Sequence, residues 1–233
     1  MLLSQKEKGY RYNSDTLLLY DFIASFSPKK GSLLDVGCGC GILGLLLKRD
    51  FPLLEVTLLD IQKENCDIAS SNATLNQLNI DAIINDDFTT HTFEQKFDFI
   101  VSNPPFYHHD AVKSEDEHLS ISRYSSYLPC DLLAKKASKT LSNRGYLFLC
   151  YDAKQTDTLL NALHHEGLKV ENIRFVHSKL HHDASLILLR ARKNSKTLCK
   201  IHPPLVMMHD NQFTQEAQAI FDKSQTKSLT WAN

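Results

Sequence analysis

The sequence predicts an α/β fold in which helices cover a mostly parallel sheet that closes with an antiparallel hairpin. Short apolar runs alternate with helix-like segments over most of the 233 residues, and this alternation is typical of parallel strands joined by helices. The last two strand-like runs, at 169–177 and 184–192, are joined by a short polar loop without a helix. Such a loop joins antiparallel neighbours.

Local signals support each element in turn. Ser14 is a suitable N-cap for a helix from Thr16 to Phe26, which Ser27-Pro28 would end. Apolar patterns predict strands at 32–36, 54–59, 82–85, 97–101 and 146–151, and helices at 41–49, 63–78, 131–141 and 156–166. With the hairpin, we expect a seven-stranded sheet. We assign residues 1–194 to one domain and residues 195–233 to an extension packed on it.

The tetrapeptide Asn103-Pro104-Pro105-Phe106 follows the predicted strand at 97–101. The two prolines fix two φ angles, so the Asn103 side-chain oxygen and the Pro104 carbonyl are candidate acceptors that need little reorganisation. Two such acceptors suit the two hydrogens of a planar exocyclic amine. Phe106 or Tyr107 offers a face on which a base could stack. The alternative is a proline-rich turn that only ends a strand.

A second candidate site lies upstream, where the predicted strand at 32–36 runs into three glycines, Gly37, Gly39 and Gly41, and then into a helix. Glycines allow a sharp turn and close approach of a ligand to the backbone. The next strand ends in Asp60-Ile61, at the offset where an acidic residue meets ribose hydroxyls in a nucleotide-binding unit. The spacing G-x-G-x-G, with Asp35 before it, departs from the G-x-G-x-x-G of dinucleotide sites.

This glycine segment resembles the first motif of class I S-adenosylmethionine-dependent methyltransferases, and the sheet with its terminal hairpin resembles their Rossmann-like fold. The resemblance implies S-adenosylmethionine as cofactor, near Asp35, the three glycines, Asp60 and Ile61. It also implies that a carboxylate after the third strand accepts from the cofactor's adenine amino group. Asp87 with Phe88 is the preferred match, and Asp86 is the competing register.

In that family, N-P-P-[FY] after the fourth strand marks enzymes that methylate a planar nitrogen. The acceptor is then adenine N6, guanine N2 or the glutamine amide of release factors, and Asn103, Pro104, Pro105 and Phe106 become the catalytic segment. The 34 residues before Asp35 leave little room for the helical domain of release-factor enzymes. A second methyltransferase domain, often found in the guanine enzymes, would not fit either. A compact adenine-N6 enzyme matches the length best.

The segments at 9–19 and 202–216 are similar to the N-terminal and C-terminal segments of the bacterial tRNA(Val) adenine-N6 methyltransferase family. The resemblance, over residues 9 to 221, implies that an adenine in the anticodon loop of tRNA is methylated. It also implies that the N-terminal segment folds over the cofactor's methionine end, where Ser14, Asp15 and Thr16 offer oxygen atoms. Alternatively, Ser14 and Asp15 only cap a helix. A binding protein that kept the fold without turnover is the remaining alternative.

Charge adds a prediction about RNA. The formal net charge is −1, but a run of basic residues without acidic ones occupies 190–200 and predicts phosphate contacts, or else a solvated face. Arg123, in a segment similar to one after the family's catalytic loop, either contacts phosphate or pairs with a carboxylate. The predicted RNA-binding residues are Tyr107, Arg123, Arg190, Arg192, Lys193 and Lys196.

The six cysteines show no C-x-x-C spacing, so we expect no zinc site. We expect the three His-His pairs, at 108–109, 164–165 and 181–182, to lie on the surface. The N-terminus has too short an apolar stretch for a signal peptide, and we expect no membrane span. We therefore expect a cytoplasmic protein with reduced thiols, and we favour a monomer.

Overall fold

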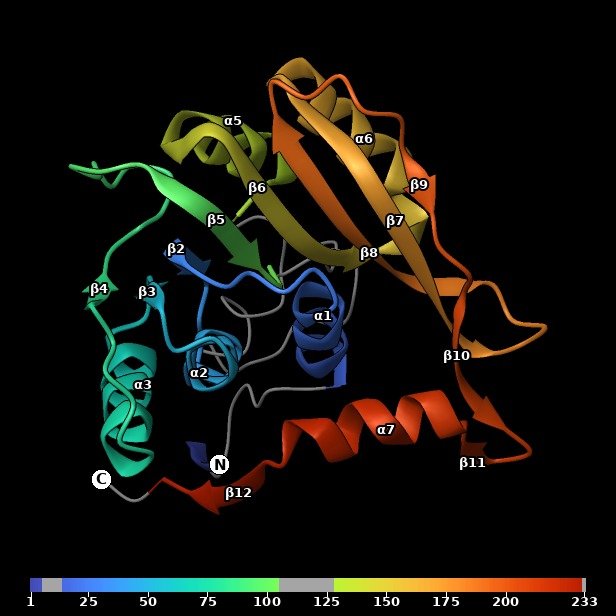
Figure 1. The fold of residues 1–233 in the computed structure, drawn as a ribbon, viewed down its shortest axis with the longest axis horizontal. Helices are drawn as coiled ribbons and strands as arrows, with labels where there is room; N and C mark the ends of the chain where they lie inside the picture. Colours follow the sequence, from blue (N-terminus) through green and yellow to red (C-terminus); the bar gives the residue numbers. More distant parts are fainter. Residues whose placement is uncertain (6–13, 105–127, 232–233) are drawn as a thin grey trace, which may run out of the picture.

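One large mixed sheet organises the chain in the computed structural model, which describes residues 1–5, 14–104 and 128–231 (Figure 1). Its strand order is β11-β10-β7-β8-β6-β5-β2-β3-β4, and β9 pairs with β7 outside this path. Strands β2 to β6 run parallel, whereas β8 is antiparallel to both β6 and β7. This is the class I methyltransferase arrangement of a largely parallel sheet with an antiparallel hairpin.

The strands are β1 (Leu2–Gln5), β2 (Gly31–Val36), β3 (Leu54–Asp60), β4 (Ala82–Asn85), β5 (Phe97–Ser102), β6 (Leu141–Asp152), β7 (Leu168–Lys179), β8 (Ala184–Lys193), β9 (Lys200–Ile201), β10 (Leu205–His209), β11 (Gln212–Phe213) and β12 (Lys227–Thr230). The helices are α1 (Ser14–Ala24), α2 (Ile42–Asp50), α3 (Lys63–Leu75), α5 (Cys130–Thr140), α6 (Thr156–His165) and α7 (Gln215–Ser224), with a short 3₁₀ turn, η2 (Ala153–Gln155).

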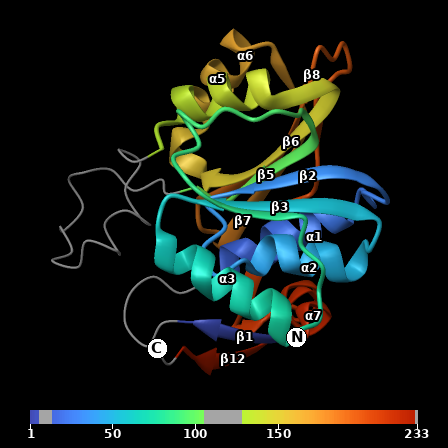
Figure 2. The ribbon, with the colours of Figure 1, turned by 90° about the vertical axis from the view of Figure 1, so that its left-hand side faces the viewer.

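The helices form two layers around the sheet. Figure 2 shows α5 and α6 above the sheet and α1, α2 and α3 below it. The central strands are buried on both faces, as β2 and β6 illustrate, where Leu33, Leu34, Leu147 and Leu149 have no exposed surface. Continuous burial of this kind is expected for parallel strands covered by helices on both sides.

The seven predicted strands are β2 to β8, and the predicted hairpin is β7 and β8. Several predicted boundaries were wrong. The helix predicted from Thr16 to Phe26 runs from Ser14 to Ala24, so Ser14 lies within the helix and not before it. α3 ends at Leu75 rather than Leu78 because Gln77 adopts the left-handed conformation (φ 55°), which ends a helix. The strand predicted from Tyr146 begins at Leu141, the residue that directly follows α5.

Residues 195–231 add four strands and a helix that the sequence pattern did not predict. β10 runs parallel to β7 and extends the sheet, while β12 pairs in parallel with β1 in a separate two-stranded sheet. Asn72 of α3 fixes β1, because its side-chain amide donates to the Ser4 carbonyl and its oxygen accepts from the Ser4 N–H. The two ends of the chain therefore lie on the same side of the molecule (Figure 2).

A polar cluster joins α1, α2 and α7. The Tyr20 hydroxyl donates to Asp50, the Arg49 guanidinium donates to the Ser224 carbonyl at 2.6 Å, and Lys223 pairs with Asp21 at 2.8 Å. Burial and the neighbouring Asp50 carboxylate raise the pKa of Tyr20 above its usual value, so the hydroxyl keeps the proton it donates. These contacts hold α7 against the C-terminal half of α1.

Among the described residues, no helix is both long enough and apolar enough to cross a membrane.

Candidate active site

The ends of three adjacent parallel strands bring the two predicted motifs together. The register pairs Val36 of β2 with Leu59 of β3 and with Ser102 of β5, so the segments that follow these strands leave the same edge of the sheet. The Ser102 hydroxyl donates to the Val36 carbonyl at 2.7 Å and is fully buried. Asn103 therefore begins directly beside the glycine turn.

The glycine turn adopts the conformation that its residues predict. Gly37, Gly39 and Gly41 have φ values of 69°, 55° and 84°, in the left-handed region that favours glycine. Among the described residues, a Cβ at Gly37 or Gly39 would meet no atom within 4 Å, whereas one at Gly41 would lie 3.0 Å from the Ala69 Cβ. Gly41 is thus required by packing, while Gly37 and Gly39 border open space that a ligand could use.

Asp35 lies beneath this turn, almost fully buried. Its Oδ2 accepts a hydrogen bond from the Gly44 N–H at 2.9 Å, within the first turn of α2. The carboxylate therefore caps α2 from the preceding strand. Burial raises the pKa of Asp35 to about 7, the Gly44 hydrogen bond opposes this rise, and the charge of Asp60 adds to it.

Asp60, at the end of β3, fixes the shape of the turn. Its Oδ2 accepts from the Gly39 N–H at 2.9 Å, and its Oδ1 accepts from the Gln62 N–H at 2.9 Å and from the Asn65 side chain at 3.1 Å. These contacts hold the Asp60 carboxylate beside Gly39, at the carboxyl end of β3. The Ile61 side chain, next in the chain, is 47% exposed and could contact a bound ring.

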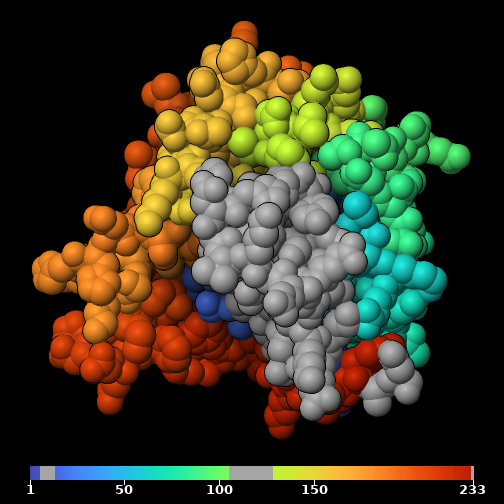
Figure 3. All heavy atoms as spheres, turned by 180° about the vertical axis from the view of Figure 1, so that it is seen from behind, coloured from blue at the N-terminus to red at the C-terminus, as the bar shows by residue number. Residues whose placement is uncertain are grey.

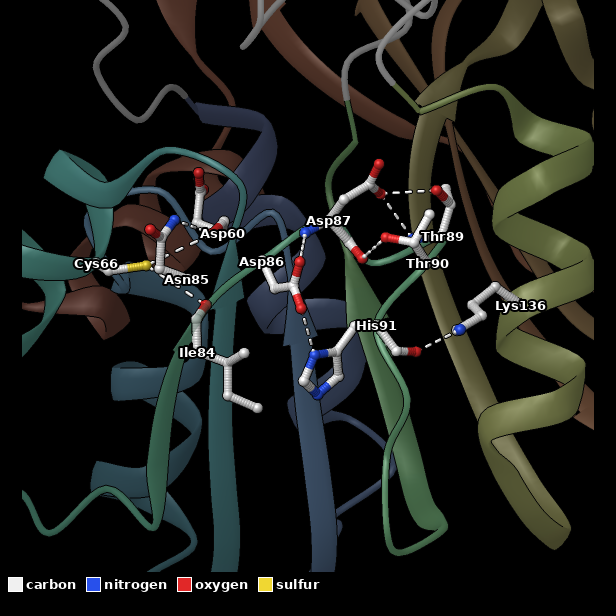
Figure 4. Close-up of polar contacts among 10 residues, drawn as sticks. All are labelled: Asp60, Cys66, Ile84, Asn85, Asp86, Asp87, Thr89, Thr90, His91 and Lys136. Atoms are coloured by element: carbon white, nitrogen blue, oxygen red, sulfur yellow. Dashed lines mark hydrogen bonds and ion pairs between the residues drawn. The ribbon is translucent and has the colours of Figure 1, made fainter.

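The segment after β4 separates Asp86 from Asp87. Figure 4 shows the Asp86 carboxylate turned toward His91, which it meets at 2.7 Å, and this hydrogen bond lowers the pKa of Asp86. Asp87 instead closes a local turn, accepting from the Thr89 N–H and hydroxyl at 2.8 Å each. In Figure 4, Asp87 points toward the same end of the sheet as Asp60.

Phe88, beside Asp87, is buried at 3% exposure and packs against Phe93 with ring centroids 6.1 Å apart. This anchor holds the turn in place. The geometry favours Asp87 over Asp86 for contact with a ligand, because His91 already engages the Asp86 carboxylate. The assignment of the adenine contact itself stays a prediction.

Asn103 has the most informative environment of the predicted residues. Its Nδ2 donates to the Thr16 hydroxyl oxygen at 3.0 Å, and Thr16, in the first turn of α1, is 6% exposed. Its Oδ1 is buried without a hydrogen-bond partner, a condition that only one other side-chain atom of the described residues, Arg190 Nε, shares. An unpaired buried acceptor is costly, so this oxygen is a candidate ligand contact.

The other residues predicted near the site have different positions. Ser14 is exposed and Asp15 is half-buried at the start of α1, where the Ser14 hydroxyl lies 3.2 Å from an Asp15 oxygen, an arrangement that also suits the capping alternative. Pro104 is buried. The predictions for Pro105, Phe106, Tyr107 and Arg123 lie outside the described residues. Figure 3, the view from behind, shows α5 (yellow-green) at the top and the segments after β3 and β4 (cyan to green) on the right.

The predicted basic strip lies further along the hairpin. Arg190 pairs with Phe148 of β6 and Arg192 with Tyr146, positions that recede from the strand ends beside Asn103. The Arg190 guanidinium donates to the buried Glu171 at 2.9 Å, and Lys193 Nζ donates to the Ser138 carbonyl at 2.6 Å. These charges already have partners within the fold, whereas Lys196 is exposed. Contact of the strip with RNA stays a prediction.

Two functional features were missed from the sequence. One is the hydrogen bond that the Thr16 hydroxyl accepts from Asn103, 87 positions away, and the contact of Thr16 with the cofactor stays a prediction. Gly44 was not singled out, yet a Cβ there would overlap Leu58. No local pattern predicts either contact, because each depends on how strands and helices meet.

Cysteines and histidines do not gather into a metal site among the residues that the structure describes. Burial raises the pKa of the Cys40 thiol to about 12 and that of Cys38 well above its usual value. Both thiols in the glycine turn are therefore protonated at neutral pH and serve as small buried side chains.

Comparison with known proteins adds independent findings. The family model described as the methyltransferase small domain matches residues 13–170. The tRNA1(Val) (adenine(37)-N6)-methyltransferase of Phocaeicola vulgatus is 27% identical over 191 residues, which cover 81% of this chain and 80% of that protein. The Ribosomal RNA small subunit methyltransferase C of Pasteurella multocida is 42% identical over 87 residues, which cover 36% of this chain. The match spans only 25% of that relative's length.

Solved structures share the fold. A protein described as a predicted O-methyltransferase, Atu636 from Agrobacterium tumefaciens, superposes with a TM-score of 0.71 at 18% identity, covering 92% of this chain and 99% of that one. The ribosomal protein L11 methylase of Lactobacillus delbrueckii subsp. bulgaricus gives a TM-score of 0.59 at 22% identity, covering 78% of this chain and 80% of that one. At these identities the likeness concerns the fold alone.

Proposed function

Because the chain belongs to the methyltransferase small domain family, we propose that it transfers a methyl group to the exocyclic N6 of an adenine in tRNA, with an anticodon-loop adenine as the target. The family and its structural neighbours imply S-adenosylmethionine as the cofactor. The residues at the strand ends fit this molecule. A Cβ at Gly37 or Gly39 would meet no described atom within 4 Å, and Asp60 binds the Gly39 N–H at the end of β3, where an acidic residue meets ribose hydroxyls in nucleotide-binding units.

One observation carries the choice of an amine as methyl acceptor. Asn103 Oδ1 is buried without a partner among the described residues, and the amide nitrogen donates to Thr16, so the side chain offers an unpaired acceptor. An acceptor of this kind suits an N–H of the substrate. A hydroxyl acceptor for the methyl group would require a base to remove its single proton, whereas an amine offers two hydrogens to fixed acceptors.

The chemistry places few demands on the chain. When bound, the cofactor supplies a methyl group on a positively charged sulfur, which leaves with the electrons of the carbon–sulfur bond. Asn103 Oδ1 and the Pro104 carbonyl accept hydrogen bonds from the two N–H groups of the substrate amine. These two hydrogen bonds turn the nitrogen lone pair toward the methyl group. The nitrogen forms the new bond and then releases a proton to water. Positioning and preorganised acceptors account for the rate.

The tRNA substrate rests on coverage. The relative named as a tRNA1(Val) adenine-N6 methyltransferase matches 81% of the chain, more than the ribosomal RNA relative at 36% or the release factor glutamine methyltransferase of Flavobacterium psychrophilum at 58%. A loop adenine can be splayed out without opening a duplex. We propose Phe106 as the ring on which it stacks, and Tyr107, Arg123 and Lys196 as further RNA contacts.

The test uses methyl-labelled cofactor and three separate acceptor pools, unmodified tRNA, ribosomal RNA and release factor, with mass spectrometry of the labelled product. We expect N6-methyladenosine in tRNA alone. Asn103→Ala should abolish most labelling, with a cost on the order of 3 kcal/mol for the loss of one fixed acceptor. Asn76→Ala, at the C-cap of α3 and away from the strand ends, is the matched control and should keep full activity.

Two other outcomes would overturn parts of the proposal. Label in guanosine or in glutamine would keep the amine mechanism and replace the substrate. No label in any pool, with cofactor binding intact, would contradict the enzymatic proposal and favour the binding-protein alternative.

A further inference from the structure

We propose that Thr16 is a positioning residue that fixes the orientation of the Asn103 amide, so that Oδ1 rather than the NH₂ group faces the methyl acceptor. The inference rests on the proposed function, because it concerns the same acceptor atom. It adds a role for α1. From the sequence, Thr16 in this helix was predicted to contact the cofactor.

The side-chain amide of Asn103 has two possible orientations. The two ends of an asparagine side chain have nearly the same shape, but one end accepts and the other donates. If the Asn103 amide turned by half a rotation, its NH₂ would face the N–H of the substrate amine. Two donors would then point at each other, and the amine could not be oriented.

The Thr16 hydroxyl is the contact that holds the Asn103 amide in the observed orientation. Asn103 Nδ2 donates to Thr16 Oγ1 at 3.0 Å, and the Thr16 side chain is buried at 6% residue exposure. Asn103 Oδ1 has no hydrogen-bond partner within the described part of the chain. This hydrogen bond holds the amide nitrogen against α1 and leaves Oδ1 unpaired. Replacement of Thr16 by valine removes the contact that fixes this arrangement.

Further contacts hold both Thr16 and Asn103 in place. Thr16 lies in the first turn of α1, and four residues later Tyr20 donates to Asp50 of α2. The neighbouring Asp21 pairs with Lys223 of α7 at 2.8 Å. On the other side, Ser102 donates to the Val36 carbonyl and fixes the residue before Asn103. Both partners of the hydrogen bond are thus held by contacts of their own.

The experiment replaces Thr16 with valine, which keeps the volume of the side chain and removes its oxygen. Thr16→Ser keeps the oxygen and is the conservative variant. Thr140→Val is the matched control, because Thr140 is also buried, at 4% exposure, but directly precedes Leu141, which pairs with the opposite end of β5. All three are assayed with the acceptor that wild-type protein labels.

We expect kcat to fall about 10- to 100-fold in Thr16→Val, while the Kd for S-adenosylmethionine, measured by calorimetry, changes less than about twofold. Thr16→Ser should recover most of the lost kcat, and Thr140→Val should keep wild-type kcat. The double variant Thr16→Val with Asn103→Ala should be no slower than Asn103→Ala alone, because both changes remove the same oriented acceptor.

A second readout does not depend on turnover. The side-chain NH₂ of Asn103, assigned by its disappearance in Asn103→Ala, should exchange with deuterated water more slowly in wild-type protein than in Thr16→Val. Equal exchange rates would contradict the hydrogen bond as the orienting contact.

The outcomes separate this inference from the proposed function. Loss of activity in Asn103→Ala together with full kcat in Thr16→Val would overturn the role of Thr16 and leave the function intact. Full activity in Asn103→Ala would overturn the amine mechanism itself. Weakened cofactor affinity with unchanged kcat in Thr16→Val would return Thr16 to the cofactor site and refute the positioning role.

Discussion

Replacement of Asp35 by asparagine tests whether the carboxyl group beneath the glycine turn titrates near neutrality. Burial raises its pKa from 3.8 to about 7. Between these values the folded protein holds a proton that the unfolded chain has released. The free energy of unfolding of the wild-type protein therefore falls as pH rises through this window.

The magnitude follows from the size of the shift. A shift of about three units, at about 1.4 kcal/mol per unit, corresponds to about 4 kcal/mol. This stability is present below about pH 4 and is lost above about pH 7. Asparagine has no proton to release, and its oxygen can still accept from the Gly44 N–H that Asp35 now binds at 2.9 Å. The free energy of unfolding of Asp35→Asn should therefore rise relative to that of wild type as pH rises.

The assay is urea unfolding of both proteins at roughly pH 5, 6, 7 and 8, with the m value checked for two-state behaviour. Asp67→Asn is the control, because that carboxylate is exposed on α3 and pairs only with Lys63 in a surface ion pair. Its stability should follow wild type within about 0.5 kcal/mol. Parallel pH dependences of the free energy of unfolding for wild type and Asp35→Asn would refute the reasoning. A variant that becomes less stable relative to wild type as pH rises would refute it too.

Three further substitutions test the packing of α2, the contact with the cofactor ribose and the stacking of the substrate base. Gly44→Ala should lower the free energy of unfolding, because overlap with Leu58 costs about 1–3 kcal/mol and exceeds the gain of about 1 kcal/mol in helix propensity; an unchanged Tm would contradict this. Asp60→Ala should weaken S-adenosylmethionine binding about 10- to 100-fold and also lower stability by about 1–3 kcal/mol, since it leaves the buried donors that it now binds unpaired; calorimetry and thermal melts measure the two effects, and unchanged affinity would reject the ribose contact. Phe106→Ala should raise the KM for RNA and lower kcat at normal cofactor affinity, so a loss of cofactor binding would contradict the stacking role.

The sequence predicted the fold because its signals are local. Each of the seven strands β2 to β8 has its own apolar run, and the missing helix between β7 and β8 was visible as a short polar loop. The strand pairs of the extension were not predicted, because β9 and β11 have only two residues each. Runs this short carry no period from which a strand could be recognised.

The candidate site was predicted in its residues but less in its contacts. The three glycines adopt the left-handed turn that their pattern implied. Asp35 was predicted near the cofactor, which stays a prediction, and in the structure its carboxylate accepts from the Gly44 N–H, nine positions along the chain. The helix needs this acceptor because its N-cap is Gly41, which has no side chain to cap it. A sequence pattern names the residue but does not show which donor it meets.

The position of α1 links the C-terminal extension to the acceptor atom of Asn103. Arg49 donates to the Ser224 carbonyl at the end of α7, and Lys223 pairs with Asp21 of α1. The same helix carries Thr16, whose oxygen holds the Asn103 amide nitrogen. Because a small displacement of an orienting group is costly in catalysis, we expect the contacts of α7 to affect the site through α1. Lys223→Met should therefore lower kcat more than it weakens cofactor binding, and equal changes in both would argue against this path.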